Sequence, residues 1–306
     1  MNKKPSEKMI LNDVEFLQKE FYRTYDPDYW LYKINLLWNC HENYEQVKNI
    51  LIEGMSEIID EDYKRMIRTE MHFLYFQMIE TLFEIIFAIL EYDNRDLWIS
   101  LTFSSWADNY KKIEKLSNHS LLFTKRIKTT IGFEKTEISL LRWIFYFIYP
   151  FKMTGEEWRK NLEKIKNLLL LFAKDFSDRG EYNAYKHSLR FYNSSFSMAI
   201  KANGSKKMHG IGSSRDSITF LEKKKRIFNG NKINQIMRTI KPFDFERDYN
   251  CCLIIYQLIK NIIKARKHSL LDNLKGKKIK FFIFKDVDIP KVIIPKTGVF
   301  KSSFTA

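Results

Sequence analysis

Hydrophobic residues recur every three or four positions over most of this chain, the spacing that places them on one face of an α-helix. The pattern predicts a chain of helices joined by short polar breaks. The expected helices cover residues 13–25, 29–40, 43–59, 61–92, 98–116, 136–149, 154–179, 181–194 and 245–271.

The predicted helix over residues 61–92 differs from the others because it is apolar over most of its circumference. A helix of this kind runs through the middle of a bundle, so its polar side chains need partners. Glu80 and Glu84 are the carboxylates that need them most. We expect one of them to pair with Lys186, His187 or Arg190, either as a structural ion pair or to orient a functional cation.

Short β-prone runs interrupt the helical pattern in the last third of the chain. Residues 218–221 and 236–240 flank the turn signal Asn229-Gly230-Asn231, which predicts a β-hairpin. Residues 278–285 and 292–294 also have strand character, whereas 201–216 is polar and is expected to be a surface loop.

The fold class that these patterns predict is mainly α, a multi-helix bundle with a small β element at 216–240 and 278–295. Residues 1–272 are expected to form the helical domain, with the hairpin as an insertion near 216–240. Residues 273–306 are expected to be a short β tail packed on it. Only 10 glycines and 6 prolines occur among the 306 residues, and so few helix-breaking residues also favour long helices.

The formal net charge of +15 raises the expectation of an anionic partner, such as nucleic acid, a membrane surface or an acidic protein. A lysine-rich composition inherited from an AT-rich genome produces the same net charge without such a partner. The apolar runs 71–90 and 143–151 are interpreted as core helices, because the first holds charged residues and the second is too short to cross a membrane.

The amino-terminal residues lack the apolar stretch of a signal peptide, and the three cysteines have neither a metal-ligand spacing nor a disulfide framework. We therefore expect a cytoplasmic protein with no transmembrane segment, no metal and no cofactor.

The candidate chemistry lies in the segment Glu181–Arg190. On a helix, Asn183, Lys186, His187 and Arg190 form one polar row, which Ser194 would extend. Two cations, an amide and an imidazole suit an anion such as a phosphate. A solvated or structurally paired helix face is the other interpretation. Arg65, Arg68 and His72 form a second strip on the long helix.

No motif for a phosphate-binding loop, a serine nucleophile or a zinc site occurs in the sequence. An imidazole beside cations can cleave RNA without a metal, because the 2′-hydroxyl is the nucleophile. In that chemistry His187 transfers the proton, Lys186 and Arg190 stabilise the charge on phosphorus, and Asn183 orients the imidazole. The candidate catalytic residues are His187, Lys186, Arg190, Asn183, Glu80 and Glu84.

The run Tyr182-Asn183-x-x-Lys186-His187-x-x-Arg190, together with the long helix that carries Glu80 and Glu84, resembles the helical HEPN-type proteins of bacteria. These include abortive-infection and toxin–antitoxin members, and the resemblance covers about residues 60–270. It implies an RNase or nucleic-acid-binding protein of phage defence that acts as a homodimer. In that group an Arg and a His four to six residues apart cleave RNA.

This sequence departs from that spacing, because seven residues separate Arg179 from His187. Six separate Arg65 from His72, which fits the spacing, but nothing else marks their helix as the catalytic one. Some members of the group are inactive binding modules. A non-enzymatic helical module that binds a protein partner or a nucleotide-like ligand is therefore the alternative function.

Overall fold

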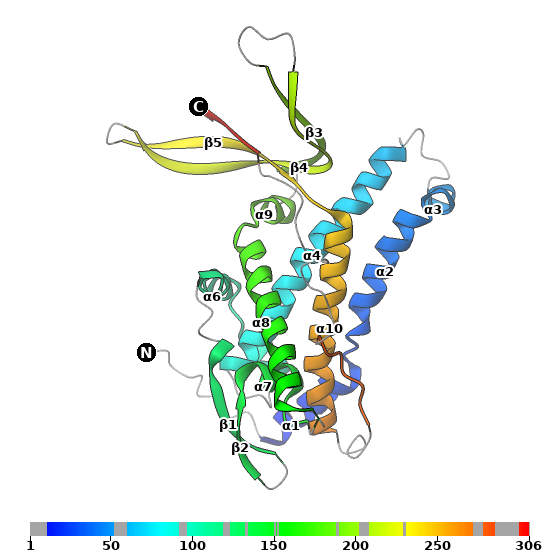
Figure 1. The fold of residues 1–306 in the computed structure, drawn as a ribbon, viewed down its shortest axis with the longest axis vertical. Coiled ribbons are helices and arrows are strands. Elements are labelled where there is room, and N and C mark those ends of the chain that lie inside the picture. The colour runs from blue at the N-terminus through cyan, green and yellow to red at the C-terminus, as the bar shows by residue number, and fades with distance from the viewer. Residues whose placement is uncertain are drawn as a thin grey trace. The chain divides into compact units, whose positions relative to one another are not determined.

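The protein is mainly α-helical with a small β element, as the sequence predicts (Figure 1). The computed structural model describes residues 11–51, 60–91, 97–118, 123–131, 134–149, 151, 153–187, 190–201, 208–228, 231–271, 278–284 and 300–305.

The chain divides into two compact units, each built from three separate segments. Unit 1 comprises Met1–Trp30, Ile79–Ser177 and Ile254–Val287. Unit 2 comprises Leu31–Met78, Asp178–Leu253 and Asp288–Ala306. Three helices contribute residues to both units: α2 (Asp28–Glu42), α4 (Asp60–Glu91) and α10 (Phe245–Leu270). Whether residues 1–272 form a domain without the tail stays a prediction.

Helix α4 is the core helix that its apolar circumference predicts. Most of its side chains between Met71 and Ile89 are buried. By length and composition, α4 is the one described helix that could cross a membrane, and 72% of its most apolar window is buried inside the protein. A buried apolar helix is what the core of a globular protein requires.

Unit 1 contains a helical bundle and one β-hairpin. Its other helices are α1 (Leu11–Thr24), α5 (Leu97–Thr102), α6 (Trp106–Asn118), α7 (Leu140–Tyr146) and α8 (Gly155–Ser177). The hairpin pairs β1 (Arg126–Ile131) with β2 (Glu134–Ser139) in antiparallel register and lies beside α7 (Figure 1).

The start of α8 and the end of α7 are both held by side chains. Thr154 and Glu157 form the capping box that the sequence predicts, with each side chain accepting the other residue's backbone N–H. Arg266 is fully buried and donates to the carbonyl oxygens of Trp143 and Ile144 in the last turn of α7, at 3.4 and 2.7 Å. A cation is stabilising at a helix carboxyl end.

The tail segment 278–284 is not a strand, contrary to the sequence prediction. Two asparagines hold it instead. Asn261 exchanges hydrogen bonds with both backbone groups of Phe282, at 2.8 and 3.1 Å. Asn161 accepts the N–H of Phe284 at 2.8 Å. Side-chain amides here satisfy the backbone as a neighbouring strand would. The predicted strand over 292–294 lies outside the described residues.

Unit 2 carries a four-stranded antiparallel sheet in the order β3-β4-β5-β6. The strands are β3 (Phe191–Lys201), β4 (Met208–Phe228), β5 (Asn231–Pro242) and β6 (Phe300–Thr305). The predicted hairpin is confirmed as β4–β5. The loop predicted over 201–216 is wrong for 208–216, which belong to β4, and β6 is a strand that the pattern missed.

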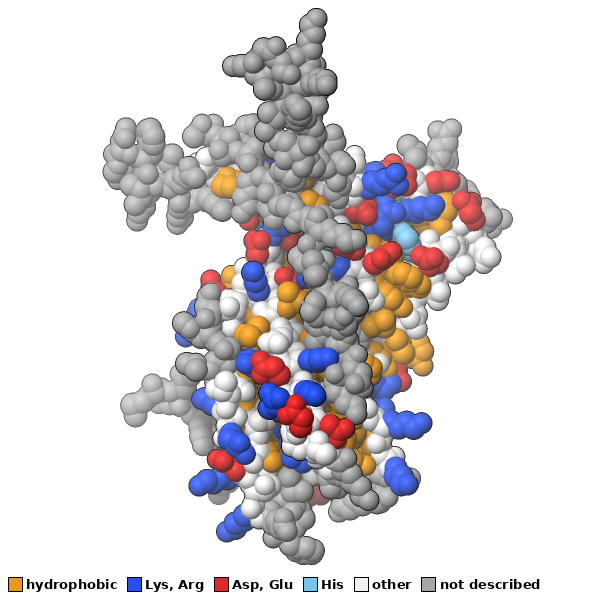
Figure 2. Space-filling model, viewed as in Figure 1, with side chains coloured by type: hydrophobic (Ala, Val, Ile, Leu, Met, Phe, Trp, Pro, Cys, Tyr) orange, Lys and Arg blue, Asp and Glu red, His pale blue; other side chains and the backbone are white. Residues whose placement is uncertain are grey.

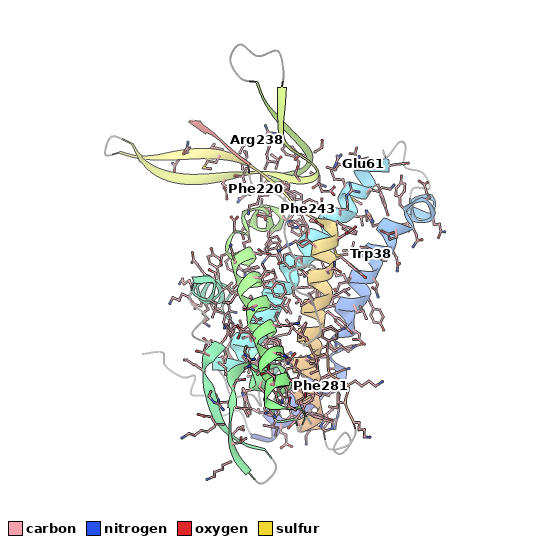
Figure 3. All side chains as sticks on the ribbon, viewed as in Figure 1. Trp38, Glu61, Phe220, Arg238, Phe243 and Phe281 are labelled. Atoms are coloured by element: carbon pink, nitrogen blue, oxygen red, sulfur yellow. The ribbon has the colours of Figure 1, made fainter. Side chains whose placement is uncertain are left out.

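The helices of unit 2 include α3 (Tyr44–Leu51), α9 (Gly180–Lys186) and parts of α2 and α10. They differ in their contact with the sheet, and α9 is the one that packs against β4 and β3 in the described residues. Trp38 of α2, which is labelled in Figure 3, stacks on Tyr249 of α10 with ring centroids 4.0 Å apart. Helix α9 lies directly against β4, since a Cβ atom at Gly180 would stand 2.7 Å from Glu222 and 2.8 Å from Phe220.

Two further helix predictions are wrong in part. Residues 136–139 of the expected 136–149 helix belong to β2 (Glu134–Ser139), and α7 begins only at Leu140. The expected 98–116 helix is two helices, α5 and α6, with a break before Trp106. The periodicity of the apolar positions continues through both breaks, so it does not reveal them.

Candidate functional site

The polar row expected over Asn183–Ser194 is not one helix face. Helix α9 ends at Lys186, His187 follows it, and β3 begins at Phe191. Asn183, Lys186, His187 and Arg190 are all exposed. The helical prediction fails here because the residues from Phe191 onward form β3 and pair with β4. The first pair of this ladder is Phe191 with Phe220. This long-range pairing overrides the local helical spacing.

The other side of α9 is buried and aromatic. Tyr185 stacks on Phe73 of α4 with ring centroids 3.9 Å apart, and Tyr182 stacks on Phe76 at 5.5 Å. The Lys186 ammonium lies 4.5 Å above the Tyr182 ring, a cation–π contact. The aromatic contacts fix α9 against α4, so the exposed side chains at its carboxyl end stand on a rigid support.

Glu80 and Glu84 are half-buried residues of unit 1. Glu80 accepts a hydrogen bond from the indole nitrogen of Trp106 in α6. The candidate cations Lys186, His187 and Arg190 belong to unit 2. The expected pairing of Glu80 or Glu84 with one of them stays a prediction.

A buried charge cluster, formed by His72, Asp248, Glu181 and Lys241, lies in unit 2. His72 Nδ1 is 2.6 Å from Asp248 Oδ2, and its Nε2 is 3.9 Å from Glu181 Oε1. Lys241 Nζ is 2.8 Å from Glu181 Oε2 and 3.0 Å from Asp178 Oδ2. The cluster joins α4, α9, α10 and the end of β5.

The charges in this cluster stabilise one another. Burial alone would lower the pKa of His72, but the carboxylates of Asp248 and Glu181 outweigh it and raise that pKa to about 9. Burial acts to raise the pKa of Glu181, yet His72 and Lys241 hold it below its usual value. His72 is therefore a buried imidazolium at neutral pH, and it cannot act as a general base there.

Arg68 extends these contacts toward the sheet. Its guanidinium donates to Asp216 of β4 at 2.7 Å and to Glu61 at 2.8 Å. Arg65 pairs with Asp62 at 2.8 Å. On the face shown in Figure 2, acidic and basic side chains lie next to one another around the start of α4. The strip of Arg65, Arg68 and His72 is thus paired within the protein, which favours its structural interpretation.

The two faces of the sheet differ sharply in exposure. Side chains alternate between the faces along each strand. On the inner face, Ile218, Phe220 and Thr239 are each at most 1% exposed. The outer face carries Tyr192, Leu221 and Ile236, which are 53%, 59% and 42% exposed. Pairing of Leu221 with Arg238 and of Lys223 with Ile236 adds two cations to the outer face.

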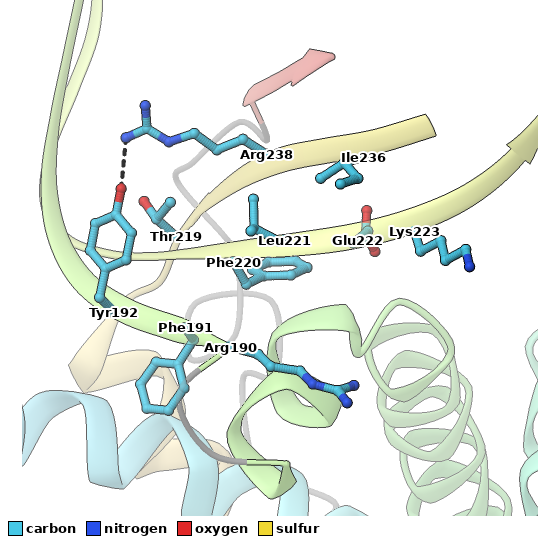
Figure 4. A pocket seen from close by; sticks show the side chains of 10 residues that line it. All are labelled: Arg190, Phe191, Tyr192, Thr219, Phe220, Leu221, Glu222, Lys223, Ile236 and Arg238. Atoms are coloured by element: carbon cyan, nitrogen blue, oxygen red, sulfur yellow. Dashed lines mark hydrogen bonds between the residues drawn. The ribbon is translucent and has the colours of Figure 1, made fainter. Parts of the chain in front are cut away.

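A groove of about 780 Å³ opens where β3 begins (Figure 4). In the described part of the sheet, β4 beyond Phe220 pairs only with β5, so its other edge is open. Arg190, Lys223 and Arg238 line this groove together with Tyr192, Leu221 and Ile236. Phe220 and Glu222, which alternate with them along β4, also line it, so the groove follows the β4 edge. Figure 4 shows Arg238 reaching across to Tyr192, whose hydroxyl accepts a hydrogen bond at 2.8 Å.

Sequence reasoning placed Arg190 at the site but missed Tyr192, Arg238 and the rest of the groove. Tyr192 lies within the helix expected over 181–194, and Arg238 lies in a β-prone run without any motif. Asp248 and Lys241 were missed as well, because their partners are distant in sequence. The basic run Lys223-Lys224-Lys225-Arg226 was the one local signal near the groove.

No group of three or more His, Cys, Asp or Glu side chains that could hold a metal occurs among the described residues. Comparison with known proteins finds no matching family model, no matching curated protein and no matching solved structure. The resemblance to HEPN-type proteins therefore stays a prediction.

Proposed function

We propose that this protein binds single-stranded nucleic acid, RNA in the first place, in the groove along the open edge of β4 in the unit 2 sheet. The observation that carries the proposal is the exposed Tyr192 ring, held by Arg238 in a groove that Arg190 and Lys223 also line. Single-stranded RNA is bound by aromatic rings that stack on its bases and by cations that contact its phosphates.

Each part of the groove has a matching part in such a ligand. The Tyr192 ring offers a stacking surface, and Leu221 and Ile236 extend it with apolar contact. The hydrogen bond from Arg238 restricts the orientation of that ring, so less entropy is lost when a base stacks on it. Arg190 and Lys223 are exposed, so they can neutralise phosphates at the edges of the groove.

Charge favours nucleic acid over an added peptide strand at the open edge of β4. The β4 sequence continues from the groove as Lys223-Lys224-Lys225-Arg226, four cations in a row. Lysine on an exposed strand edge opposes pairing with another strand. The same cations favour a polyanion, so nucleic acid fits this edge better than a protein partner does.

Cleavage is the second candidate function, and the exposure of His187 favours it. His187 follows α9 directly, and Lys186 precedes it, so an imidazole and an ammonium reach solvent three and four residues before Arg190. A bound RNA in the groove would begin near this end of α9 at Arg190. Homodimerisation, a cytoplasmic location and a role in phage defence stay predictions.

The experiment measures binding of a fluorescent single-stranded RNA to the full chain over a range of salt concentrations. We expect an affinity that falls steeply with salt, because each phosphate contact releases counterions. Tyr192→Ala should weaken binding by roughly 1–3 kcal/mol, the value of one stacked base. Tyr192→Phe keeps the ring and should retain most of the affinity. Equal binding by all three proteins would overturn the proposal.

Two further arms separate the alternatives. Incubation of RNA with the protein in EDTA tests cleavage, and His187→Ala should abolish any cleavage without changing binding. A polyanionic competitor such as heparin should displace RNA from the groove. Intact RNA in the first arm would remove the RNase candidate and leave the binding function standing.

A further inference from the structure

A second cavity, of about 510 Å³, lies in unit 1 between the β1–β2 hairpin and the first half of α8. Cavities of this size bind small organic ligands. Its wall combines apolar side chains, among them Trp158 and Leu162, with the cations Arg126, Arg142, Arg159 and Lys166. Its two carboxylates are Glu137 and Glu163, so the lining has an excess of positive charge.

Three of these cations already have carboxylate partners. Arg126 lies 3.1 Å from Glu137, and Lys166 lies 3.0 Å from Glu163. Arg159 donates two hydrogen bonds to Glu156, at 2.8 and 2.9 Å. Because these pairs neutralise themselves locally, the positive charge that remains for a ligand belongs to Arg142.

Arg142 is fixed in place without a carboxylate. Its guanidinium carbon lies 4.6 Å from the centre of the Trp158 ring, which covers one face of the planar group. In the described part of the chain Arg142 forms no salt bridge, and its Nε is buried without a hydrogen-bond acceptor. Burial lowers the pKa of this guanidinium, and no neighbouring acid offsets that effect.

We propose that this cavity binds the phosphate group of a small phosphate monoester, with Arg142 as the residue that holds the anion and Trp158 as its support. A guanidinium presents paired N–H donors that match phosphate oxygens. The apolar wall at Leu162 receives the organic part of the ligand. Both a free mononucleotide and the 5′ end of an RNA carry such a phosphate group, and the test distinguishes these two ligands.

The test titrates the full chain with adenosine 5′-monophosphate, and with adenosine as the uncharged control, by calorimetry. We expect the nucleotide to bind and adenosine to bind at least about tenfold more weakly, the value of a hydrogen bond to a charged group. Arg142→Gln should lose the difference between the two ligands. Lys111→Gln removes an exposed α6 cation outside the cavity and should leave both titrations unchanged.

A parallel arm compares a short RNA with a 5′-phosphate and the same RNA with a 5′-hydroxyl, each with wild type and Arg142→Gln. A preference for the 5′-phosphate that Arg142→Gln abolishes identifies the RNA end as the source. Arg142→Lys, which keeps the charge but not the planar stack, serves if Arg142→Gln does not fold. A wild type that distinguishes neither pair of ligands would overturn the proposal.

Discussion

Arg238 and Lys241 lie three residues apart on β5, yet the sheet gives them opposite environments. Lys241 is 7% exposed and lies between the carboxylates of Glu181 and Asp178. Arg238 lines the groove and donates to the exposed Tyr192. The two side chains carry the same charge, and the alternation of the strand alone decides which face each one occupies.

The difference shows that net charge does not locate a binding surface. The field of Lys241 is compensated by two carboxylates at hydrogen-bond distance, so little remains for an external anion. Arg238 has lost far less water and stands beside an aromatic ring that a ligand can reach. Of the cations that produce the net charge of +15, those on the outer face are the ones we expect to contact a ligand.

Removing an acid from the buried charge cluster should have the largest effect on stability. Asp248→Ala leaves the His72 imidazolium buried with only the more distant Glu181. We expect a loss of about 3–5 kcal/mol in the free energy of unfolding, measured by urea titration. Asp248→Asn keeps a hydrogen-bond acceptor and should lose less. A loss below about 1 kcal/mol for the alanine variant would contradict the account.

The pH dependence of stability isolates His72 itself. Because folding raises its pKa from 6.5 to about 9, the stabilisation is complete below pH 6.5 and disappears as pH rises to 9. A shift of this size corresponds to about 3 kcal/mol. We expect the free energy of unfolding of the wild type to fall over this window relative to that of His72→Gln. Parallel curves for the two proteins would show that the imidazolium is not stabilised.

The contact between α9 and the sheet separates the inner face from solvent. Substitution of Gly180 tests how closely the two pack. An added Cβ atom there would meet Glu222 at 2.7 Å and Phe220 at 2.8 Å. Gly180→Ala should therefore cost about 1–3 kcal/mol of stability, as overpacking does. Gly155 is also the first residue of its helix, and nothing lies within 4 Å of an added Cβ atom. Gly155→Ala should change stability by less than about 1 kcal/mol.

The sequence predicted those elements whose signals are local. The capping box at Thr154 and Glu157 begins α8, and the sequence signal Asn229-Gly230-Asn231 predicted the pairing of β4 with β5, because caps and turn signals depend on adjacent residues. The apolar circumference of α4 predicted a core helix for the same reason: every residue that defines the pattern lies within it.

The elements that the sequence missed depend on distant partners. Phe191 and Tyr192 fit a helix or a strand equally well, and pairing with Phe220 and Thr219 decides between them. The candidate row was split by that choice, which left Lys186 and His187 at the end of α9 and placed Arg190 before β3. Tyr192 and Arg238 are 46 residues apart, so no local pattern could join them.

One pair of variants tests the central claim, that the buried cations hold the fold and the outer ones bind RNA. Arg238→Gln and Lys241→Met each remove one positive charge from β5, and RNA affinity and the free energy of unfolding are measured for both. We expect Arg238→Gln to weaken RNA binding about tenfold with a stability change below about 1 kcal/mol. Lys241→Met should lose about 3 kcal/mol of stability and keep wild-type affinity under conditions in which it is folded. Equal losses of affinity in the two variants, or none in Arg238→Gln, would contradict the claim.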